Sequence, residues 1–342
     1  MSSRSVTRDD VARRAGVSVA TVSYVLNAGP KPVSADKRRR VLEAVTQLGY
    51  RPNAIARSLR ARRTNILGLI VPDSANPYFA RLSRSIEDAA AERGYQVVVS
   101  NAAEDPEREA AQIEALLRLQ VDGLLWVPAD LSASHAGAPE GVPTVQVDRA
   151  LPPSEAEPAG DVIESDNALG GRLAAEHLLE LGHRRIAFLS GPAEHLHTIE
   201  RLRGAREAAS EAGVELEVRH GDFGYRSGYE AGRAWFSLPP AERPTAVICA
   251  NDAMALGALC AAAEAGVRVP ADLSVTGYDD IAQARYTVPP LTTVAQPLDE
   301  MAREAIDRLL VRVGPKAERP EPVRRVYPVK LVVRNSTARV RE

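Results

Sequence analysis

The chain has 342 residues, of which 45% are hydrophobic and 26% charged, and its formal net charge is −2 at pH 7. This length suits a small domain followed by a larger two-lobed one, and the composition excludes a disordered chain. No run of about 18 uncharged apolar residues is present, so we expect no membrane span. The start, MSSRSVTRDD, lacks the apolar core of a secretion signal, and two cysteines in apolar surroundings predict neither a disulfide framework nor a metal site. We therefore expect a cytoplasmic protein.

The overall charge conceals an uneven distribution along the chain. Up to Thr64 there are 14 basic and 4 acidic residues, a net charge of +10, which leaves −12 for all the residues after it. A basic head on an acidic body is what the neutralisation of DNA phosphates requires. The charge pattern therefore favours a nucleic-acid partner for the N-terminal segment.

Thr7–Asn27 predicts two short helices joined by a tight turn. Thr7 suits the N-cap of the first helix, Gly16 interrupts the apolar spacing, and Ser18 can cap the second helix. Neutral and mostly small side chains form the outward face of the second helix: Val19, Ala20, Thr21, Ser23 and Tyr24. This arrangement is typical of a helix-turn-helix, whose second helix enters the DNA major groove. A helical hairpin that binds nothing is the alternative, and the local charge favours DNA binding.

A third helix is expected to close this head. Ser34 can cap it, and it runs to about Leu48. The side chains expected to face inward are Val41, Leu42, Val45 and Leu48. Lys37–Arg40 lies near the N-terminal end of this helix, where it could grip phosphate. A solvated charged face is the alternative, and four consecutive basic residues argue against it.

Asn53–Leu59, followed by Arg60, predicts a further helix of under two turns. A helix this short is marginal alone in water, because nucleation costs more than a few hydrogen bonds return. We expect it to be disordered without DNA and ordered with it. A plain linker is the alternative, but Ile55 and Leu59 at i, i+4 favour a helix.

Beyond the basic head, short apolar strands alternate with amphipathic helices. This alternation indicates an α/β fold with parallel sheets covered on both faces. The number of strand–helix units requires two doubly wound sheets, with a boundary near Asp161–Ser165. ILGLIVP and RIAFLSGP open the two lobes alike. A last long helix is expected at Asp299–Val311 and a terminal strand at Lys330–Val333.

Ligands of parallel sheets lie at the carboxyl ends of the strands, so the residues that follow each expected strand are candidates for a binding cleft. The first lobe offers Asp73, Asn76, Tyr78, Phe79, Trp126, Asp130, Asp148 and Arg149, and the second offers Ser190, Asn251, Asp252, Asp279 and Asp280. Carboxylates, an amide, arginines and rings suit a neutral polyhydroxyl compound. Asp252 as a helix cap, Asp280 as a turn residue and Trp126 as a wall residue are the alternatives for those three.

Signs of catalysis are absent from the sequence, which contains no GxGxxG, GxxxxGK[ST], HExxH or GxSxG. Of the six histidines only His195 and His197 are close in sequence, and two ligands alone do not make a metal site. We expect no catalytic residue, no metal and no cofactor, and therefore no enzyme.

A series of motifs spans nearly the whole chain: TRDDVARRAGVSVATVSYVLN, VSADKRRRVLEAVTQLGYRPNAIARSLR, ILGLIVPD, NPYF, DNALGGRLAAEHLLELGHRRIAFLSGP, ERLRG, ANDAMALGAL, VTGYDD, PPLTTVAQP and LVVRNST. In this order they resemble the lactose-repressor (LacI) family. The resemblance implies a helix-turn-helix head, a hinge helix, and a periplasmic-binding-protein-like core that binds a small effector between two lobes and dimerises.

The domain boundaries expected from this resemblance are 1–52 for the head, 53–64 for the hinge helix and linker, and 65–342 for the core. Within the core, the first lobe is expected at about 65–163 with a returning segment near 292–325. The second lobe is expected at about 164–291 with the C-terminal strand.

The resemblance also assigns DNA contacts residue by residue. Val19 and Ala20 fall where the family reads operator bases, and Leu59 falls where its members insert a leucine into the minor groove. Tyr24 departs from the Arg or His often found at its position, so no operator sequence is carried over. The expected DNA-binding residues are Thr7, Ser18, Val19, Ala20, Thr21, Ser23, Tyr24, Asn27, Lys37, Arg38, Asn53, Ala56, Leu59 and Arg60.

The same resemblance narrows the cleft residues to eight expected effector contacts. They are Tyr78, Phe79 and Asp148 from the first lobe, and His197, Arg201, Phe223, Asn251 and Asp279 from the second. Their chemistry is that of a site for a sugar or sugar derivative.

We therefore predict a homodimeric transcriptional regulator, a repressor, that binds a palindromic double-stranded DNA operator under the control of this effector and has no membrane partner. One alternative keeps this architecture with a purine-type co-repressor. Another is a cytoplasmic sugar-sensing module without specific operator recognition. The segment after Val333 is too short for the heptads of a tetramerising coil, so we expect dimers.

Leu59→Ala is expected to weaken operator binding and to leave effector affinity the same. An apolar wedge costs a few kcal/mol of base unstacking, which the added contacts recover, and alanine is too short to act as one. Fluorescence anisotropy measures the change, and equal operator affinity of the two proteins would remove the wedge from the account.

Overall fold

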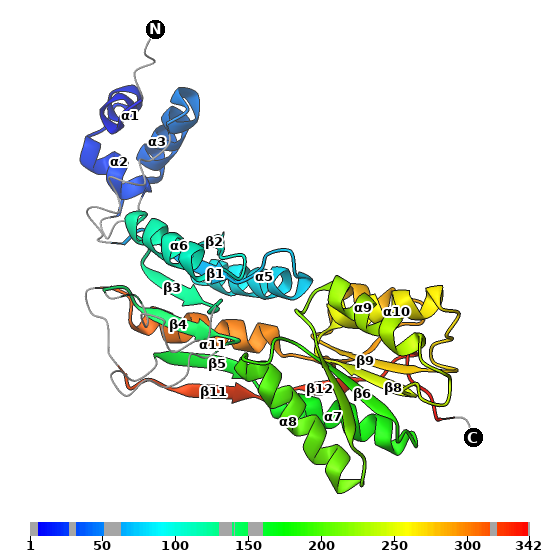
Figure 1. Ribbon diagram of the computed structural model, residues 1–342. Helices are drawn as coiled ribbons and strands as arrows, with labels where there is room; N and C mark the ends of the chain where they lie inside the picture. The colour runs from blue at the N-terminus through cyan, green and yellow to red at the C-terminus, as the bar shows by residue number, and fades with distance from the viewer. Residues whose placement is uncertain are drawn as a thin grey trace. The chain divides into compact units, whose positions relative to one another are not determined.

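The computed structural model describes residues 6–26, 32–50, 63–129, 139, 141–149, 160–314 and 320–340. The chain divides into two compact units, Met1–Thr64 and Asn65–Glu342, which are described separately below. Figure 1 labels their helices and strands. The expected hinge helix at Asn53–Leu59 lies outside the described residues.

The N-terminal unit contains three helices, α1 (Arg8–Ala15), α2 (Val19–Leu26) and α3 (Ala35–Leu48). Thr7 caps α1 in a capping box with Asp10, and Gly16 ends α1 in the left-handed conformation with φ of 62°. The Ser18 hydroxyl accepts a hydrogen bond from the Thr21 backbone N–H at 3.2 Å at the start of α2. These caps set the tight turn, so the predicted helix-turn-helix is confirmed.

The core of this head is small and apolar, with Val11, Val22 and Val41 completely buried. Two expectations for α3 were wrong. Ser34 stands at the N-cap of α3, but its side chain makes no capping hydrogen bond. Leu42 is 48% exposed, because the buried stripe of α3 follows the i, i+3 spacing of Val41 and Ala44.

The second unit contains two six-stranded sheets. The first has the order β11-β5-β4-β3-β1-β2, with bounds β1 Ile66–Val71, β2 Gln96–Asn101, β3 Gly123–Trp126, β4 Thr144–Val147, β5 Asp161–Ser165 and β11 Arg324–Tyr327. The second has the order β12-β10-β9-β8-β6-β7, with bounds β6 Ile186–Ser190, β7 Leu216–His220, β8 Ala246–Cys249, β9 Ser274–Tyr278, β10 Thr292–Ala295 and β12 Lys330–Val332. All neighbouring strands are parallel except β10 and β12.

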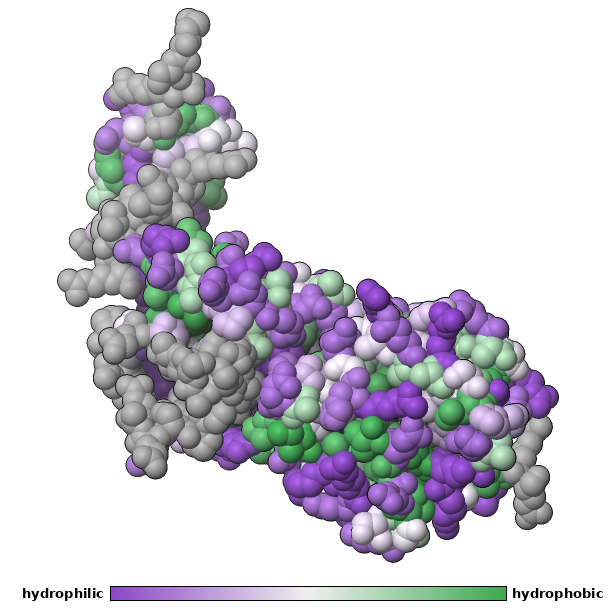
Figure 2. All heavy atoms as spheres, in the orientation of Figure 1, coloured by the Kyte–Doolittle hydropathy of each residue, from purple (hydrophilic) through white to green (hydrophobic). Residues whose placement is uncertain are grey.

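Helices cover both sheets (Figure 1). Those that pack on the first sheet are α5 (Pro77–Glu92), α6 (Pro106–Arg118) and α11 (Leu298–Val311). Those of the second are α7 (Asn167–Glu180), α8 (Leu196–Glu211), α9 (Tyr225–Phe236) and α10 (Asp252–Glu264), with a 3-10 turn at Ala282–Arg285. This is the expected two-lobed α/β core. On the face shown in Figure 2 its surface is mostly hydrophilic, with smaller hydrophobic areas between.

The strands near the lobe boundary differ from the sequence-based prediction. All of β5 belongs to the first sheet, where Asp161–Ser165 was expected only as a boundary, and β11 was not expected as a strand. Because β10 pairs with β9 in the second sheet, the segment that returns to the first lobe begins after Ala295, not near 292. Charged residues in β5 and β11 mask the apolar pattern by which strands are predicted. In β5, Asp161 is buried, and its carboxylate pairs with Arg308 and with Arg312, each at 2.8 Å.

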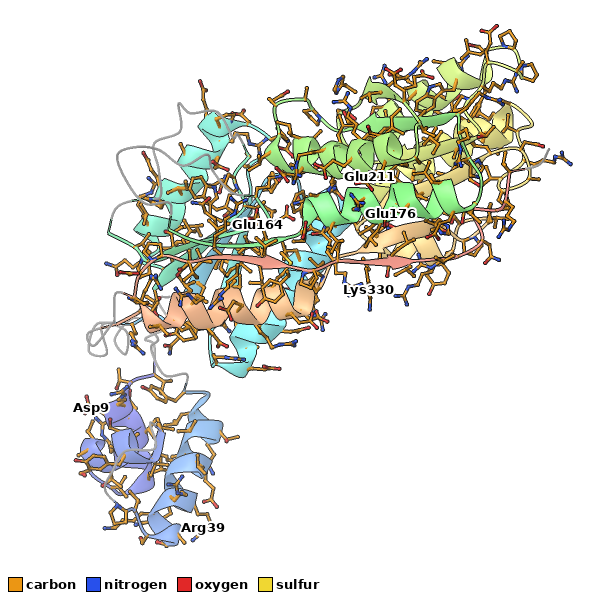
Figure 3. The ribbon with its side chains drawn as sticks, turned by 90° about the horizontal axis from the view of Figure 1, so that it is seen from below. Asp9, Arg39, Glu164, Glu176, Glu211 and Lys330 are labelled. Atoms are coloured by element: carbon orange, nitrogen blue, oxygen red, sulfur yellow. The ribbon has the colours of Figure 1, made fainter. Side chains whose placement is uncertain are left out.

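Two glycines bring α7 and α8 unusually close. A Cβ atom at Gly171 would lie 1.8 Å from the carbonyl oxygen of Arg201, and one at Gly204 would lie 1.9 Å from that of Ala168. Arg172 adds a link, because it pairs with Glu176 of α7 and with Glu211 of α8, both labelled in Figure 3. These contacts fix α8 against α7, and α8 carries two of the expected effector residues.

Candidate functional site

The outward face of α2 carries the side chains expected to read DNA. Ser18, Val19 and Ala20 are exposed, while Thr21, Ser23 and Tyr24 are half-buried. This part of the head therefore presents small neutral groups and one aromatic ring to a partner, and the Ser18 and Thr21 hydroxyl oxygens lie 2.9 Å apart. Thymine methyl groups and mixed donor–acceptor edges are the base features that such side chains can contact.

The basic run at the start of α3 divides into free and committed side chains. Lys37 and Arg38 are exposed and form no ion pair with the other described residues, which leaves their charges for phosphate. Arg39 pairs with Asp36 at 2.7 Å and with Glu43 at 3.2 Å.

Several expected DNA contacts stay predictions. The Thr7 hydroxyl donates to Asp10 at 2.7 Å within the head, so its first role is to cap α1. The positions outside the described residues are Asn27, Asn53, Ala56, Leu59 and Arg60.

The core unit brings all eight expected effector residues to one cavity of about 20 Å³, which we call the inner cavity. They are Tyr78, Phe79, Asp148, His197, Arg201, Phe223, Asn251 and Asp279, and Asn76 and Arg149 complete the lining. The first sheet with its helices supplies half of this lining and the second sheet supplies the other half. The cavity therefore lies between the lobes, at the carboxyl ends of their strands, as parallel sheets favour.

Gln296 links the two halves of this site, and sequence reasoning missed it. Its amide nitrogen donates to Asp279 of the second lobe at 2.8 Å. Its amide oxygen accepts from Ser165 at 2.6 Å and lies 3.2 Å from the Tyr78 hydroxyl, which donates to Asp148 of the first lobe. Gln296 follows β10 directly, so the strand-end rule used for the other residues would have found it.

Arg201 is held in one orientation by three groups. Its guanidinium donates to Asn167 at 2.8 Å and to the backbone carbonyl of Ala250 at 2.6 Å, and it lies 3.6 Å above the Tyr278 ring. Arg201 is only 5% exposed. A guanidinium fixed in this way can present its remaining N–H groups to a ligand without losing conformational entropy.

Asn251 lines the cavity and also forms two hydrogen bonds within the second lobe. Its side-chain oxygen caps α10 by accepting from Met254 N–H at 2.9 Å, and its amide donates to the carbonyl of Phe223 at 2.9 Å. It therefore positions Phe223, whose ring stacks on His197 with centroids 5.2 Å apart.

Three other cleft candidates point elsewhere. Asp252 is completely buried and accepts from Thr293 at 2.6 Å and from Ile281 N–H at 2.9 Å. Asp280 pairs with Arg334, and Trp126 is completely buried in the first lobe. None of the three lines the inner cavity. The alternative given for Asp252 was wrong in detail, because Asn251 and not Asp252 caps α10, and Trp126 is not a wall residue of this cavity.

Burial alters the ionisation of the acidic groups in this cavity. It raises the pKa of Asp148, and it raises the pKa of Asp279 to about 7 despite the nearby Arg201 charge. Burial and the charges of Arg149 and Arg201 hold the pKa of His197 well below its usual value, so its imidazole is neutral at pH 7. The site can thus both donate and accept hydrogen bonds, which hydroxyl groups require.

The stability of the core is expected to fall as pH rises from about 4 to about 7. Asp279 ionises near 3.8 in the unfolded chain but near 7 when folded, so only the unfolded state gains from ionisation in this interval. Asp279→Asn cannot ionise and should lose this contribution, which is at most about 4 kcal/mol. Urea unfolding at several pH values measures it. Parallel pH profiles of the two proteins would contradict the assignment.

The described residues contain neither a metal-binding cluster nor a membrane-spanning helix. No group of three or more His, Cys, Asp or Glu side chains there is placed to hold a metal ion. None of the helices described is both long and apolar enough to cross a bilayer.

Both units of the chain match known protein families. Residues 7–53 match the family described as bacterial regulatory proteins, lacI family, and residues 175–337 match the periplasmic binding protein-like domain. The ribose operon repressor of Escherichia coli (strain K12) is 39% identical over 316 residues, which cover 90% of this chain and 93% of that protein. The HTH-type transcriptional repressor PurR of Klebsiella pneumoniae (strain 342) is 39% identical over 336 residues, which cover 96% of each chain.

Among solved structures, that of the lac repressor dimer bound to operator and the anti-inducer ONPF has a TM-score of 0.81 and 31% identity. The match covers 98% of this chain and 100% of that chain. The likeness therefore extends over both units and is not limited to either one.

Proposed function

Because this chain belongs to the LacI family of bacterial regulatory proteins, DNA-binding repressors with an effector-binding core, we propose that it controls a palindromic operator in response to a sugar or sugar derivative. It acts in the cytoplasm as a homodimer. Each head meets one operator half-site, and the two-fold symmetry of the dimer requires a palindromic sequence. Membership of this family also argues against an enzyme and against a sensing module without operator recognition.

The observation that carries the effector proposal is the convergence of polar side chains from both lobes on one cavity. The two curated relatives are equally identical to this chain, so identity does not select the effector. The chemistry of the cavity favours a sugar, because Asp148, Asp279 and Arg201 suit paired hydroxyl groups, and Phe79 and Phe223 suit the apolar face of a sugar ring.

The size of the cavity supports control by lobe movement. A space of about 20 Å³ holds about one water molecule, so a sugar ring enters only when the lobes separate. Gln296 bridges Asp279 of one lobe and the Tyr78–Asp148 pair of the other. When the lobes separate, these hydrogen bonds would break and Gln296 would form new ones with the ligand. An effector that binds one lobe arrangement more tightly shifts the population toward it.

A thermal-shift panel of sugars and purines tests the effector class. We expect at least one sugar to raise the melting temperature, since a ligand that binds only the folded state stabilises it. In parallel, affinities for palindromic and scrambled DNA are compared at physiological salt, where specific binding exceeds phosphate attraction by about 1,000-fold or more. A purine as the sole stabilising ligand would replace the sugar, and equal affinity for both DNAs would refute operator recognition.

A further inference from the structure

A second and larger cavity of about 150 Å³ adjoins the inner one and shares Asp148, Arg149 and His197 with it. We call it the outer cavity. Its other polar lining residues are Glu164, Ser165, Asp166, Asn167, Glu200, Arg203 and Arg324. Because three residues face both spaces, a ligand in the inner cavity can extend directly into the outer one.

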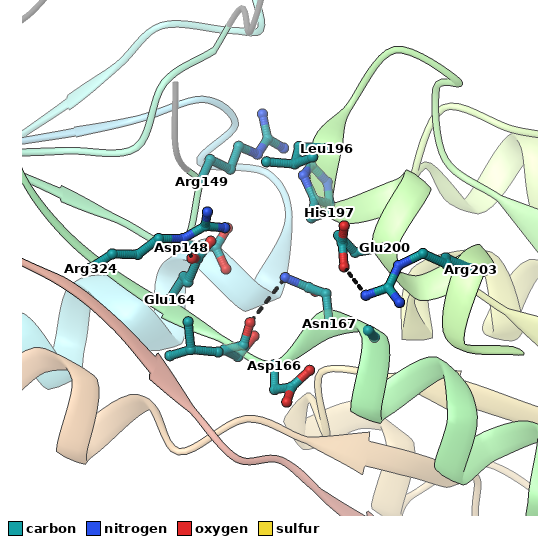
Figure 4. Close-up of a pocket in the computed structure, with 13 residues that line it drawn as sticks. Asp148, Arg149, Glu164, Asp166, Asn167, Leu196, His197, Glu200, Arg203 and Arg324 are labelled. Carbon is teal, nitrogen blue, oxygen red and sulfur yellow. Dashed lines mark hydrogen bonds and ion pairs between the residues drawn. The ribbon is translucent and has the colours of Figure 1, made fainter. Parts of the chain in front are cut away.

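The outer cavity also lies between the lobes. Figure 4 shows Glu164 of β5 and Arg324 of β11 reaching in from the first lobe, and Glu200 and Arg203 of α8 from the second. A ligand that fills it therefore contacts both lobes, as a ligand in the inner cavity does.

Most of the charged side chains that line the outer cavity already have partners within the protein. Glu164 pairs with Arg324, and Glu200 pairs with Arg203 at 2.6 Å. Asp166 accepts from the backbone of Leu169 at 2.8 Å as the cap of α7. An ionic ligand would have to break one of these pairs, whereas hydroxyl groups can use the lone pairs and N–H groups that the pairs leave free.

Two buried polar atoms at the junction of the cavities point to a ligand with hydrogen-bonding groups. Arg149 is 3% exposed and His197 is 8% exposed. Arg149 Nε and His197 Nδ1 make no hydrogen bond with any described residue. Buried polar atoms left in this state are costly, so a ligand that supplies partners for both gains affinity.

The outer cavity is large enough for the skeleton of one ring. An engineered protein cavity of about 150 Å³ binds benzene, so a space of this volume accepts a six-membered ring, and the lobe separation that admits a sugar ring to the inner cavity also makes room here for hydroxyl groups. We propose that the effector carries two hydroxylated rings, one in each cavity, and is therefore a disaccharide or a comparable glycoside. This inference rests on the proposed function, which supplies the first sugar ring.

The test compares monosaccharides, the disaccharides built from them and their phosphate esters, by calorimetry on the full chain. Glucose, maltose, cellobiose, trehalose and glucose 6-phosphate form one such set. We expect one disaccharide to bind at least ten-fold more tightly than its monosaccharide. The double variant Glu200→Ala/Arg203→Ala removes both members of an ion pair from the cavity wall, and it should abolish most of that ratio. The charge that it leaves without a partner is that of Glu207, the second partner of Arg203, which does not line the cavity. Arg206→Gln, an exposed change on the same helix outside both cavities, should keep it.

Each other outcome overturns the inference in a distinct way. A monosaccharide that binds as tightly as every disaccharide containing it would refute the second ring and leave the proposed function intact. A preference for the phosphate ester that the double variant abolishes would identify an anion site instead. An unaltered ratio in the double variant would place the second ring elsewhere. No binding by any sugar would refute the proposed function together with this inference.

Discussion

Replacing Arg201 with alanine is expected to lower effector affinity by about 100-fold or more while operator binding without effector persists. The guanidinium is fixed by Asn167, by the Ala250 carbonyl and by the Tyr278 ring, and it lines the inner cavity. Two charge-assisted hydrogen bonds to a ligand are together worth about 3 kcal/mol or more, which corresponds to that loss. Calorimetry measures effector binding, and fluorescence anisotropy measures operator binding.

Arg206→Ala is the matched control, because it removes an exposed arginine from the same helix. It should leave both affinities at the values of the unaltered chain. The Arg201 substitution also removes partners from Asn167 and Ala250, so the melting temperature is recorded for each variant. A folded Arg201→Ala protein with normal effector affinity would move the effector site away from the inner cavity.

Replacing Val19 with aspartate is expected to lower operator affinity by about 100-fold or more without unfolding the head. Val19 is 40% exposed and begins α2, where a carboxylate interacts favourably with the positive end of the helix dipole. In the groove, the same carboxylate replaces an apolar base contact and faces phosphates. A loss of about 1–3 kcal/mol at each of two half-sites gives an effect of this size.

Gln47→Glu is the control for the added negative charge. The Gln47 side-chain oxygen accepts from Arg14 at 3.0 Å and 2.8 Å, and glutamate keeps both bonds. It lies near the end of α3, outside the expected DNA-binding residues. A similar loss of affinity in both variants would show that overall charge, and not the face of α2, determines binding.

The head was predictable from local chemistry because its caps are explicit. Thr7, Gly16 and Ser18 each stand where a helix must begin or end. Leu42 was misplaced because a hydrophobic side chain at an exposed position looks the same in sequence as a buried one, and only the spacing to Ala44 distinguishes it. In the core, the apolar strands were found by their composition.

The edge strand of the first sheet, the hydrogen bonds between the lobes and the outer cavity could not be predicted from local chemistry in this way. The edge strand β11 contains two arginines and is largely exposed, so it carries no apolar pattern. Its partner Glu164 lies 160 residues away, and such a long-range pair leaves no local signal. The eight inner-cavity residues were found because strand ends converge in parallel sheets and because the motifs resemble a known family, whereas their contacts with Gln296 needed the structure.

The central claim is that a ligand bound between the lobes controls the affinity of the head for DNA. The most direct measurement titrates the full chain onto a fluorescent palindromic operator, with and without a saturating concentration of the stabilising sugar. The account predicts that operator affinity changes at least ten-fold for the unaltered chain and stays constant for Arg201→Ala. If the sugar binds by calorimetry and operator affinity is the same in its presence and absence, the claim is wrong.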